Sequence, residues 1–577
     1  MSTTTQPDPQ PRQKDILVST MLNSTSTAPR HDLVLRPAAS VGDLAEPAHR
    51  TVEKDGMVIE QDIAVPVRTG GVVYIDVYRP VDRLDVSLPV IVAWGAFGKH
   101  VRGMAALFAD GHGVAPEWIS EHTPFEAPDP AYWCAHGYAV AFADPRGTWN
   151  SPGTYTHGDE SEAQDYHDLV EWLGTQAWSS GRVGISGVSY LARSAFAVAA
   201  TQPPHLAAIN ACESFVDMYR EFAFHGGIPE TRFTGMITER VAHGRGLAED
   251  LGANFAAHPL IGDDPYWASR SIDAGAITVP ALVIASWGDQ GLHTRGTFDA
   301  FTAIGSSEKW LRAHGRKKWQ YYYQPENVER LRTFFDRHLK GEGPGLDGTP
   351  RVEIEVREMV DVGAVRAELE WPPARTEHRQ LFLDAVEGTL ESEPTPAETA
   401  SLYDARSGRA VFDHTFDEDI ELTGYMALRL WIASDIGTDA DVFVAVEKIG
   451  EDGVRVPQVF YATFTDGPVA QGWLRASHRA LDTERSTPQR PLHPHDREEP
   501  LEPGVPVPID IEIWPSSTMF RAGEALRLIV AGADIYGEDD PGLPTDSPWP
   551  GHTTRNVGRH VLRAGGRFDS YLLVPVL

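Results

Sequence analysis

The chain has 577 residues, 42% of them hydrophobic, and a formal net charge of −32. This length favours several domains, and the apolar content is enough for sizeable cores. The strong acidity argues against a nucleic-acid partner, because no basic surface is available to neutralise phosphates, and it disfavours anionic membranes and anionic substrates. We attribute the acidity itself to solubility.

The N-terminus carries no sign of export. Its first residues, MSTTTQPDPQPRQKDILVST, contain no apolar segment followed by a small-residue cleavage site, and no apolar run is long enough for a membrane span. The two cysteines, Cys134 and Cys212, have neither metal-binding nor redox spacing, which suits a reducing compartment. We therefore expect a cytoplasmic protein whose residues 1–50 form a flexible tail.

Strands and helices then alternate along the chain. GMVIEQDIAVPVRTGGVVYIDVYRP predicts two strands, and LPVIVAW, GYAVAFAD, GRVGIS and VPALVIAS predict buried ones. EAQDYHDLVEWLGTQ, with acids in its first turn, and the Ala-rich LARSAFAVAATQ predict helices. This alternation predicts a mostly parallel, doubly wound α/β core over residues 51–201 and 274–345, with ligands at the carboxyl ends of its strands.

Two further regions differ from this core. Between residues 202 and 273 the strand pattern fades, and segments such as FTGMITERVAHGRGLAEDL look helical, which predicts a helical cap over the sheet. From residue 351 to 577 there are many short alternating strands, among them YMALRLWIAS and DVFVAVEKI, punctuated by Gly, Pro and Asp. This texture predicts an all-β, jelly-roll-like C-terminal domain.

The stretch GRVGISGVSYLARS, residues 181–194, places Ser189 where a strand turns into a helix. A nucleophile at such a turn is exposed at the edge of the sheet, and the helix N-terminus behind it favours developing negative charge. The backbone N–H of Tyr190 can face a tetrahedral oxyanion. Because position 191 is Leu and not Gly, the strict pattern is not met, and an ordinary turn serine stays open as the alternative.

A serine hydroxyl needs a base, and the base needs an orienting acid. In this topology the chain order is serine, acid, histidine. Asp289 ends a later predicted strand, and His314 lies in the polar segment after the next one, so both stand in the required order. His293 is a rival base or, with Asp289, a metal ligand. We favour His314, because His293 is only four residues from Asp289 and no third metal ligand is evident.

The chain resembles the cocaine esterase-like hydrolases, the CocE/NonD group, which is related to X-Pro dipeptidyl-peptidases and α-amino acid ester hydrolases. The matching segments are DPRGTWNSPG, DLVEWLGTQAWSSGRVGISGVSYLA, SWGDQG and RTFFDRHLKG in the core, and LTGYMALRLWIASD and PIDIEIWPSSTMFRAGEALRL in the β domain. This resemblance covers roughly residues 55–577. It implies an α/β-hydrolase core, with Ser189, Asp289 and His314 as nucleophile, acid and base.

The chain departs from the family at the oxyanion hole. The family often has a Tyr whose hydroxyl supplies the second donor, and the matching residue here is Phe97, which has no side-chain donor. We expect a backbone N–H of the Phe97 loop to take this role beside the N–H of Tyr190. Ala192 stands in place of the family's final Gly, which we regard as minor.

The resemblance also bears on the substrate. Relatives that act on α-amino acid esters carry acids two and three residues after the catalytic Asp, and these places are Gly291 and Leu292 here. A substrate ammonium would therefore lack this counter-charge. Trp94, Trp149 and Trp287 fall near the ends of predicted core strands and are candidate walls of an acyl pocket, with ordinary core packing as the alternative.

The sequence predicts a serine hydrolase that cleaves an uncharged carboxylic ester, or less favourably an amide, through an acyl-enzyme. The alternatives are an X-Pro dipeptidyl-peptidase, an α-amino acid ester hydrolase or acyltransferase, and a catalytically silent binding protein that keeps the fold. We expect no cofactor and no metal: HGDESEAQDYHD is interpreted as acids at a helix start and a solvated face, and HPHD lies in a Pro- and charge-rich loop. The expected partner is a small-molecule ester, without nucleic acid or membrane, and the oligomeric state is open.

Overall fold

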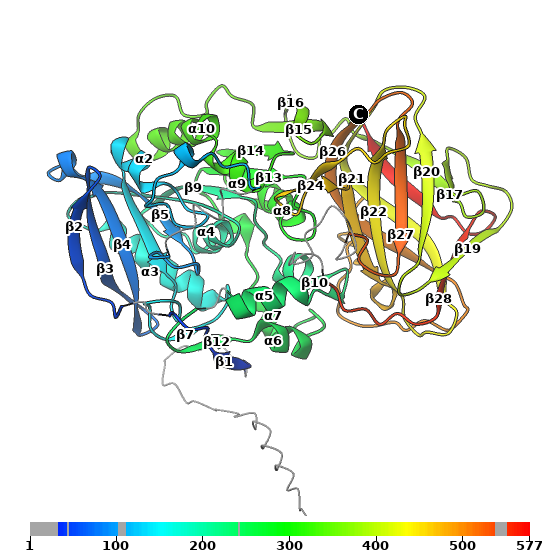
Figure 1. Ribbon diagram of the computed structural model, residues 1–577, viewed down its shortest axis with the longest axis horizontal. Coiled ribbons are helices and arrows are strands. Elements are labelled where there is room, and N and C mark those ends of the chain that lie inside the picture. Colours follow the sequence, from blue (N-terminus) through cyan, green and yellow to red (C-terminus); the bar gives the residue numbers. More distant parts are fainter. Residues whose placement is uncertain (1–32, 43–44, 102–110, 241–242, 537–550) are drawn as a thin grey trace, which may run out of the picture. The chain divides into compact units, whose positions relative to one another are not determined.

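The computed structural model describes residues 33–42, 45–101, 111–240, 243–536 and 551–577. These residues belong to one compact unit, His31–Leu577 (Figure 1). Most of the predicted N-terminal tail, residues 1–32, lies outside the described residues. No helix of the described parts is long and apolar enough to cross a membrane.

The N-terminal half is built on one large sheet whose central strands are parallel. Consecutive neighbours are β2 (Arg50–Lys54), β3 (Met57–Val67), β4 (Gly71–Pro80), β6 (Ala139–Asp144), β5 (Leu88–Trp94), β8 (Ser179–Val188), β9 (Leu206–Cys212), β13 (Ala281–Ser286), β14 (Lys309–His314), β15 (Val352–Met359) and β16 (Val362–Glu368). The pairs from β6 through β15 are parallel, because each strand is reached by a crossover. The predicted doubly wound sheet is confirmed.

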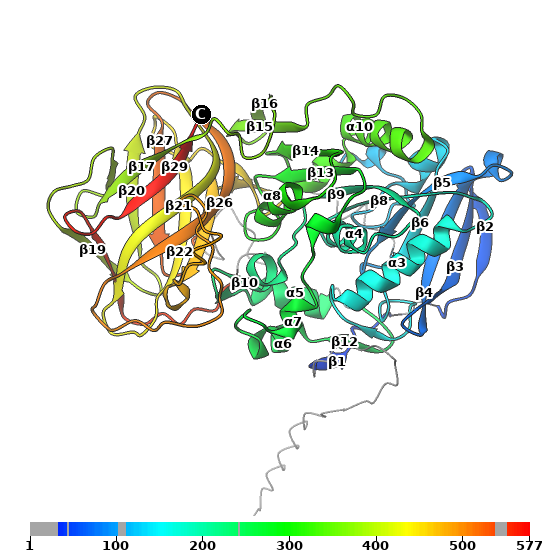
Figure 2. The same cartoon turned by 180° about the vertical axis from the view of Figure 1, so that it is seen from behind.

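Helices pack against this sheet. The helices α3 (Glu160–Gly174) and α4 (Tyr190–Ala200) lie side by side, as Figure 2 shows. Asp159 caps α3 by accepting from the N–H of Glu162, as the acids at its start predict. Gly184 in the middle of β8 allows α10 (Pro325–Phe335) and the turn that follows it to approach the sheet. A Cβ at this position would lie 2.7 Å from Leu339 in that turn.

The insertion begins later than the sequence predicts. Residues Leu206–Cys212 form β9 in the centre of the sheet, so the predicted cap boundary at residue 202 is wrong. The segment LAAINAC has only one β-branched residue, so its pattern resembles a helix. The insertion itself mixes helices and short strands: η3 (Tyr219–Ala223), β10 (Phe224–His225), β11 (Ile228–Pro229), α5 (Arg232–Arg240), β12 (Leu247–Glu249), α6 (Leu251–Ala257), α7 (Pro265–Ala268) and η4 (Ala274–Ala276).

The chain before the core is partly ordered. Residues Leu35–Pro37 form β1, which pairs with β12 of the insertion, and β12 also pairs with β7 (Thr154–Tyr155). The predicted flexible tail therefore does not extend to residue 50. Residues 35–37 alone carry too little pattern to predict a strand, because their pairing partner lies more than 200 residues away.

The C-terminal half is an all-β domain, as predicted. Its strands are β17 (Glu377–Asp384), β18 (Thr389–Glu391), β19 (Thr399–Asp404), β20 (Arg409–Thr415), β21 (Ile420–Ser434), β22 (Asp441–Ile449), β23 (Gln458–Phe460), β24 (Phe464–Gly467), β25 (Ala470–Arg475), β26 (Val507–Phe520), β27 (Ala525–Ala531), β28 (Arg559–Ala564) and β29 (Tyr571–Val576). The long strands β21 and β26 pair antiparallel along most of their length. Since β15 and β16 extend the hydrolase sheet, the domain starts after Glu368 and not at residue 351.

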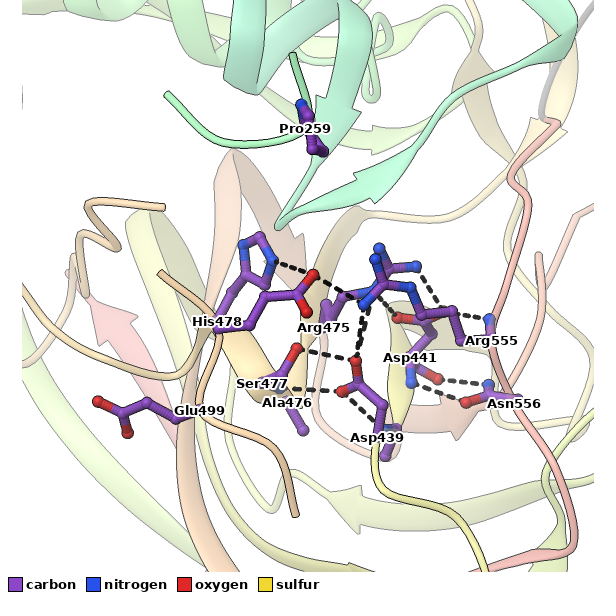
Figure 3. A network of polar contacts seen from close by, with 12 residues as sticks. Pro259, Asp439, Asp441, Arg475, Ala476, Ser477, His478, Glu499, Arg555 and Asn556 are labelled. Carbon is purple, nitrogen blue, oxygen red and sulfur yellow. Dashed lines mark hydrogen bonds and ion pairs between the residues drawn. The ribbon is translucent and has the colours of Figure 1, made fainter. Parts of the chain in front are cut away.

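A buried ionic network ties strands of this domain together (Figure 3). Arg475 donates to both oxygens of Asp441, at 2.7 and 2.9 Å. Asp439 accepts from the backbone N–H and the hydroxyl of Ser477, and Asn556 donates to the Asp441 carbonyl. Every group is matched, as burial of charge requires, so the network has a structural explanation.

Candidate active site

Ser189 lies at a strained turn between β8 and α4. Its backbone has φ 59° and ψ −117°, which a non-glycine residue adopts only when its surroundings enforce it. Two carbonyls at the end of β9, those of Cys212 and Glu213, each accept from the Ser189 N–H at 3.0 Å. The side chain is partly exposed, and α4 starts at Tyr190, so the hydroxyl stands at the mouth of a helix N-terminus.

The tight approach around this turn explains the Leu at position 191. A Cβ at Gly187 would lie 2.4 Å from the Leu191 Cβ, and a Cβ at Gly95 would lie 2.8 Å from Leu191 Cδ1. Both glycines therefore make room for the Leu191 side chain. The turn therefore closes without a glycine at position 191, because Gly187 and Gly95 provide the space that the Leu191 side chain occupies.

His293 is the histidine that contacts Ser189. Its Nε2 lies 3.1 Å from Ser189 Oγ, and its Nδ1 contacts Asp289 Oδ2. The segment from Asp289 to His293 forms a single turn, in which the Asp289 carbonyl accepts from the His293 N–H at 3.1 Å. Residues four apart on such a turn face the same side. The sequence analysis disfavours His293 because it is only four residues from Asp289. In the structure, this short spacing is what brings Asp289 and His293 together.

The hydrogen bonds indicate the tautomer of His293. A carboxylate can only accept, so Nδ1 carries the proton that faces Asp289, and Nε2 is free to accept from the serine hydroxyl. Burial and the nearby Lys318 ammonium lower the pKa of His293 to about 4, against the opposing effect of Asp289. The imidazole is therefore neutral at pH 7, which is the state that a general base requires.

His314 is placed elsewhere. It ends β14, and its Nε2 lies 3.3 Å from Glu213 Oε1. Its Nδ1 accepts from the Arg316 N–H, and its ring stacks on Tyr321 with centroids 3.8 Å apart. Burial lowers the pKa of His314 to about 3. The described hydrogen bonds include none between His314 and Ser189, so the geometry favours His293 over the predicted base.

Asp289 has a second partner that the sequence analysis missed. Lys318 Nζ lies 2.5 Å from Asp289 Oδ2 and 3.0 Å from His293 Nδ1. Burial opposes ionisation of Asp289, but Lys318 and His293 outweigh it and hold the pKa of the carboxyl below its usual range. Asp289 is therefore ionised, as an acid that orients a histidine should be.

Known proteins resemble this chain over both halves. The family of X-Pro dipeptidyl-peptidases called S15 matches residues 70–317, and the C-terminal non-catalytic domain of X-Pro dipeptidyl-peptidases matches residues 344–573. A CocE/NonD family hydrolase from Staphylococcus aureus, known as a crystal structure, is 36% identical with a TM-score of 0.85, covering 94% of this chain and 98% of that one. The chain belongs to the CocE/NonD family. It is a serine hydrolase.

Two other relatives set this assignment in context. The cocaine esterase of a Rhodococcus species is 25% identical over 489 residues, which are 68% of this chain and 81% of that protein. The structure of an α-amino acid ester hydrolase has a TM-score of 0.68 at 16% identity and covers 93% of this chain and all of that one. At this low identity it supports the fold alone, an α/β-hydrolase core followed by a β domain.

The loop after β5 brings Phe97 next to the nucleophile turn of this CocE/NonD hydrolase. The Phe97 ring contacts the rings of Phe125 and Tyr190, with centroids 4.8 and 6.4 Å away. The Ala96 carbonyl accepts from Trp149 Nε1 at 2.8 Å. Because the peptide is planar and trans, the Phe97 N–H points in the opposite direction, away from Trp149. The Phe97 N–H therefore stays a candidate donor, whereas the Phe97 side chain offers none.

The three predicted tryptophans have different places. Trp94 and Trp287 are 0% exposed. Trp94 donates to Glu162 and stacks on Tyr166, and Trp287 donates to the Glu355 carbonyl, so both belong to the core and not to a pocket wall. Trp149 is half-buried and stays a substrate-binding candidate. The apolar surroundings of His293 come instead from Phe215 of the insertion and from Leu292 in the loop after β13, which belong to one buried cluster.

Sequence reasoning also missed two buried acids near the site. Glu213 follows β9, and Glu126 precedes α2 (Pro130–Ala135). Burial raises the pKa of Glu126 to about 8 and that of Glu213 well above its usual range, with Lys318 opposing in both cases. Neither residue belongs to a motif, and the two acids and Lys318 come from three separate segments of the chain. No sequence signal could have joined them.

Proposed function

We propose that this hydrolase is a serine esterase in which Ser189 is the nucleophile, His293 the general base and Asp289 the acid that orients it. The observation that carries this proposal is the chain of contacts from Ser189 Oγ through the His293 ring to Asp289. Names of relatives agree with it, since one is a cocaine esterase and others are putative serine esterases.

The reaction follows from these contacts. Ser189 Oγ attacks the ester carbonyl carbon while its proton passes to His293 Nε2, and the carbonyl oxygen becomes an oxyanion facing the N–H of Tyr190 and a backbone N–H of the Phe97 loop. The imidazolium then gives its proton to the departing alcohol oxygen as the C–O bond breaks, which leaves an acyl-enzyme. Water repeats the sequence, and the carboxylic acid and the free serine are formed.

We propose an uncharged acyl group for the substrate. Leu292 packs in the apolar cluster of the insertion, and a Cβ at Gly291 would face Tyr461 at 3.4 Å and Trp473 at 3.6 Å. Among the described acids near Ser189, Asp289 is paired with Lys318, and burial favours the neutral form of Glu126 and Glu213, so a substrate ammonium finds no free carboxylate among them. This disfavours aminoacyl esters and X-Pro peptides, although the family matches keep a dipeptidyl-peptidase as the second candidate.

Three finer expectations belong to the same proposal. We propose that the β domain is a jelly roll. We also propose that the insertion forms a cap over the site. The cytoplasm is proposed as the location, because Cys134 and Cys212 are both buried and unpaired, which suits a reducing compartment.

A fluorophosphonate probe tests the nucleophile. The parent protein and the matched variant Ser180→Ala, which changes a surface serine of β8, should be labelled, and Ser189→Ala should not. The parent should also cleave an aryl acetate with a higher kcat/KM than an X-Pro anilide. Absence of labelling in the parent, or labelling that persists in Ser189→Ala, would favour the silent binding protein or another nucleophile, and faster X-Pro cleavage would favour the peptidase.

A further inference from the structure

A buried lysine lies against the pair formed by Asp289 and His293. Lys318 is the first residue of α9 (Lys318–Tyr323), and it is 3% exposed. Its ammonium is 2.5 Å from Asp289 Oδ2 and 3.0 Å from His293 Nδ1. The same carboxylate oxygen therefore contacts both the lysine and the histidine. The Ser-His-Asp arrangement as proposed does not use this ammonium.

The surroundings of the ammonium are acidic. Besides Asp289, the carboxyls of Glu213 and Glu126 interact with Lys318, and together these acids outweigh burial and raise its pKa. His314 lies beyond Glu213, and the neutral phenol of Tyr461 approaches from the β domain. Lys318 is thus a permanent cation, and among the described groups Lys318 and Asp289 are the charges that act on His293.

The β domain fixes the lysine in this place. The turn between β23 and β24 contains Tyr461 and Ala462, both with positive φ. The Ala462 carbonyl accepts from the Lys318 N–H at 3.0 Å, and the Ala462 N–H donates to the Gly288 carbonyl at 3.4 Å. This one turn therefore binds both Lys318 and Gly288, the residue before Asp289, and fixes their relative position. The ammonium is held beside the imidazole by the backbone as well as by its charge.

The ammonium has opposite effects on its two neighbours. It is attracted to the Asp289 carboxylate, which it helps to keep ionised. It cannot donate to His293 Nδ1, because that nitrogen already carries the proton facing Asp289, so at 3.0 Å its effect on the ring is electrostatic repulsion of the imidazolium. An acid that stays ionised and a histidine that stays neutral are the two states that general-base catalysis needs.

We propose that Lys318 is a positioning residue that keeps His293 neutral and Asp289 ionised, so that the hydrolase works in acidic solution where an ordinary catalytic histidine is protonated. This inference rests on the proposed function, since it takes His293 as the base. The lowered pKa of His293, about 4, agrees with it, although burial contributes more than Lys318 does. Lys318 accounts for part of this lowering of the His293 pKa, and replacing Lys318 measures that part alone.

The test is the pH dependence of two rates, the labelling of Ser189 by a fluorophosphonate and kcat/KM for an uncharged aryl ester. The acidic limb of the parent, the pH range in which its activity falls as the solution becomes more acidic, should lie at least about one pH unit below 6.5. This value is the pKa of an unperturbed histidine. In Lys318→Met this acidic limb should move up by about one pH unit, because the repulsion of the imidazolium is gone. Lys317→Met is the matched control, since Lys317 donates to the Gly111 carbonyl outside the cluster, and its limb should coincide with the parent's.

The outcomes separate this inference from the proposed function. If the parent is not labelled, or Ser189→Ala is, the proposed function fails. If Ser189 is labelled but the limb of Lys318→Met stays where the parent's is, only the role of Lys318 is overturned. If Lys318→Met does not fold, the parent decides by itself, and an acidic limb at about pH 6.5 or above contradicts the inference.

Discussion

At the scale of single residues, the choice between two histidines is the main result. His293 and His314 are both buried and both lie near carboxyl groups, so burial and charge alone do not distinguish them. The distinction comes from the nitrogen that each presents. His293 Nε2 accepts from Ser189, whereas His314 Nδ1 accepts from a backbone N–H and its Nε2 faces Glu213.

We predict that His293→Ala lowers kcat/KM for an aryl ester by about 10²–10⁴-fold, the usual contribution of a general base. His314→Ala should lower it by less than about tenfold, because His314 does not contact the nucleophile. Circular dichroism of both variants controls for folding. The reverse order of the two effects would restore His314, the histidine that the family resemblance favours, and would show that the loops rearrange when substrate binds.

At the scale of elements, the active site depends on how closely the loop after β5 approaches α4. Gly95 belongs to that loop and Leu191 to the first turn of α4, and a Cβ at position 95 would lie 2.8 Å from Leu191 Cδ1. The same loop carries Phe97, whose N–H is the proposed second oxyanion donor. The packing of the Leu191 side chain against Gly95 therefore limits how the Phe97 loop can move relative to α4.

We predict that Gly95→Ala lowers the free energy of unfolding by about 1–3 kcal/mol, the usual cost of overpacking. In a Leu191→Ala background the same change should cost less, with a coupling of at least about 0.5 kcal/mol, because the clashing methyl group is absent. Urea unfolding of the four proteins of this cycle measures the coupling. Strictly additive free energies would show that the two residues do not meet.

At the scale of the whole molecule, the β domain contacts the loop that carries Asp289. A Cβ at Gly288 would lie 2.7 Å from the Val459 carbonyl oxygen, and Gln290 Nε2 contacts the Pro515 carbonyl oxygen at 3.2 Å. Arg295 joins Glu221 of the insertion to Glu512 of the β domain. The loop that carries Asp289 and His293 is thus held by contacts with the β domain and the insertion.

We predict that Gly288→Ala lowers the free energy of unfolding by about 1–3 kcal/mol and also lowers kcat/KM, because the backbone next to Asp289 must shift. The matched control is Gly235→Ala in α5, where a Cβ meets nothing within 4 Å and alanine favours a helix. Thermal unfolding and ester hydrolysis are measured for both. Unchanged activity in Gly288→Ala would mean that the β domain does not position the acid.

The sequence alone determined the features that depend on local pattern. Runs of buried Val, Ile and Ala predicted the parallel strands, and alternation in segments such as DVFVAVEKI, which is β22, predicted the β domain. Ser189 and Asp289 could be proposed from the sequence because a strand-to-helix turn and a polar strand end each have a local signature. Their place in one site followed from the order of strands in the predicted sheet.

The tertiary structure decided what depends on residues distant in sequence. The strand β9 has a pattern that resembles a helix and is a strand because β8 and β13 lie on either side of it. Lys318 and Glu213 approach Asp289 from separate segments of the chain, so no spacing in the sequence could reveal their cluster. The contact of His293 with Ser189 rests on where the turn after β13 points. Side-chain direction is set by packing between elements, which one local stretch of sequence does not contain.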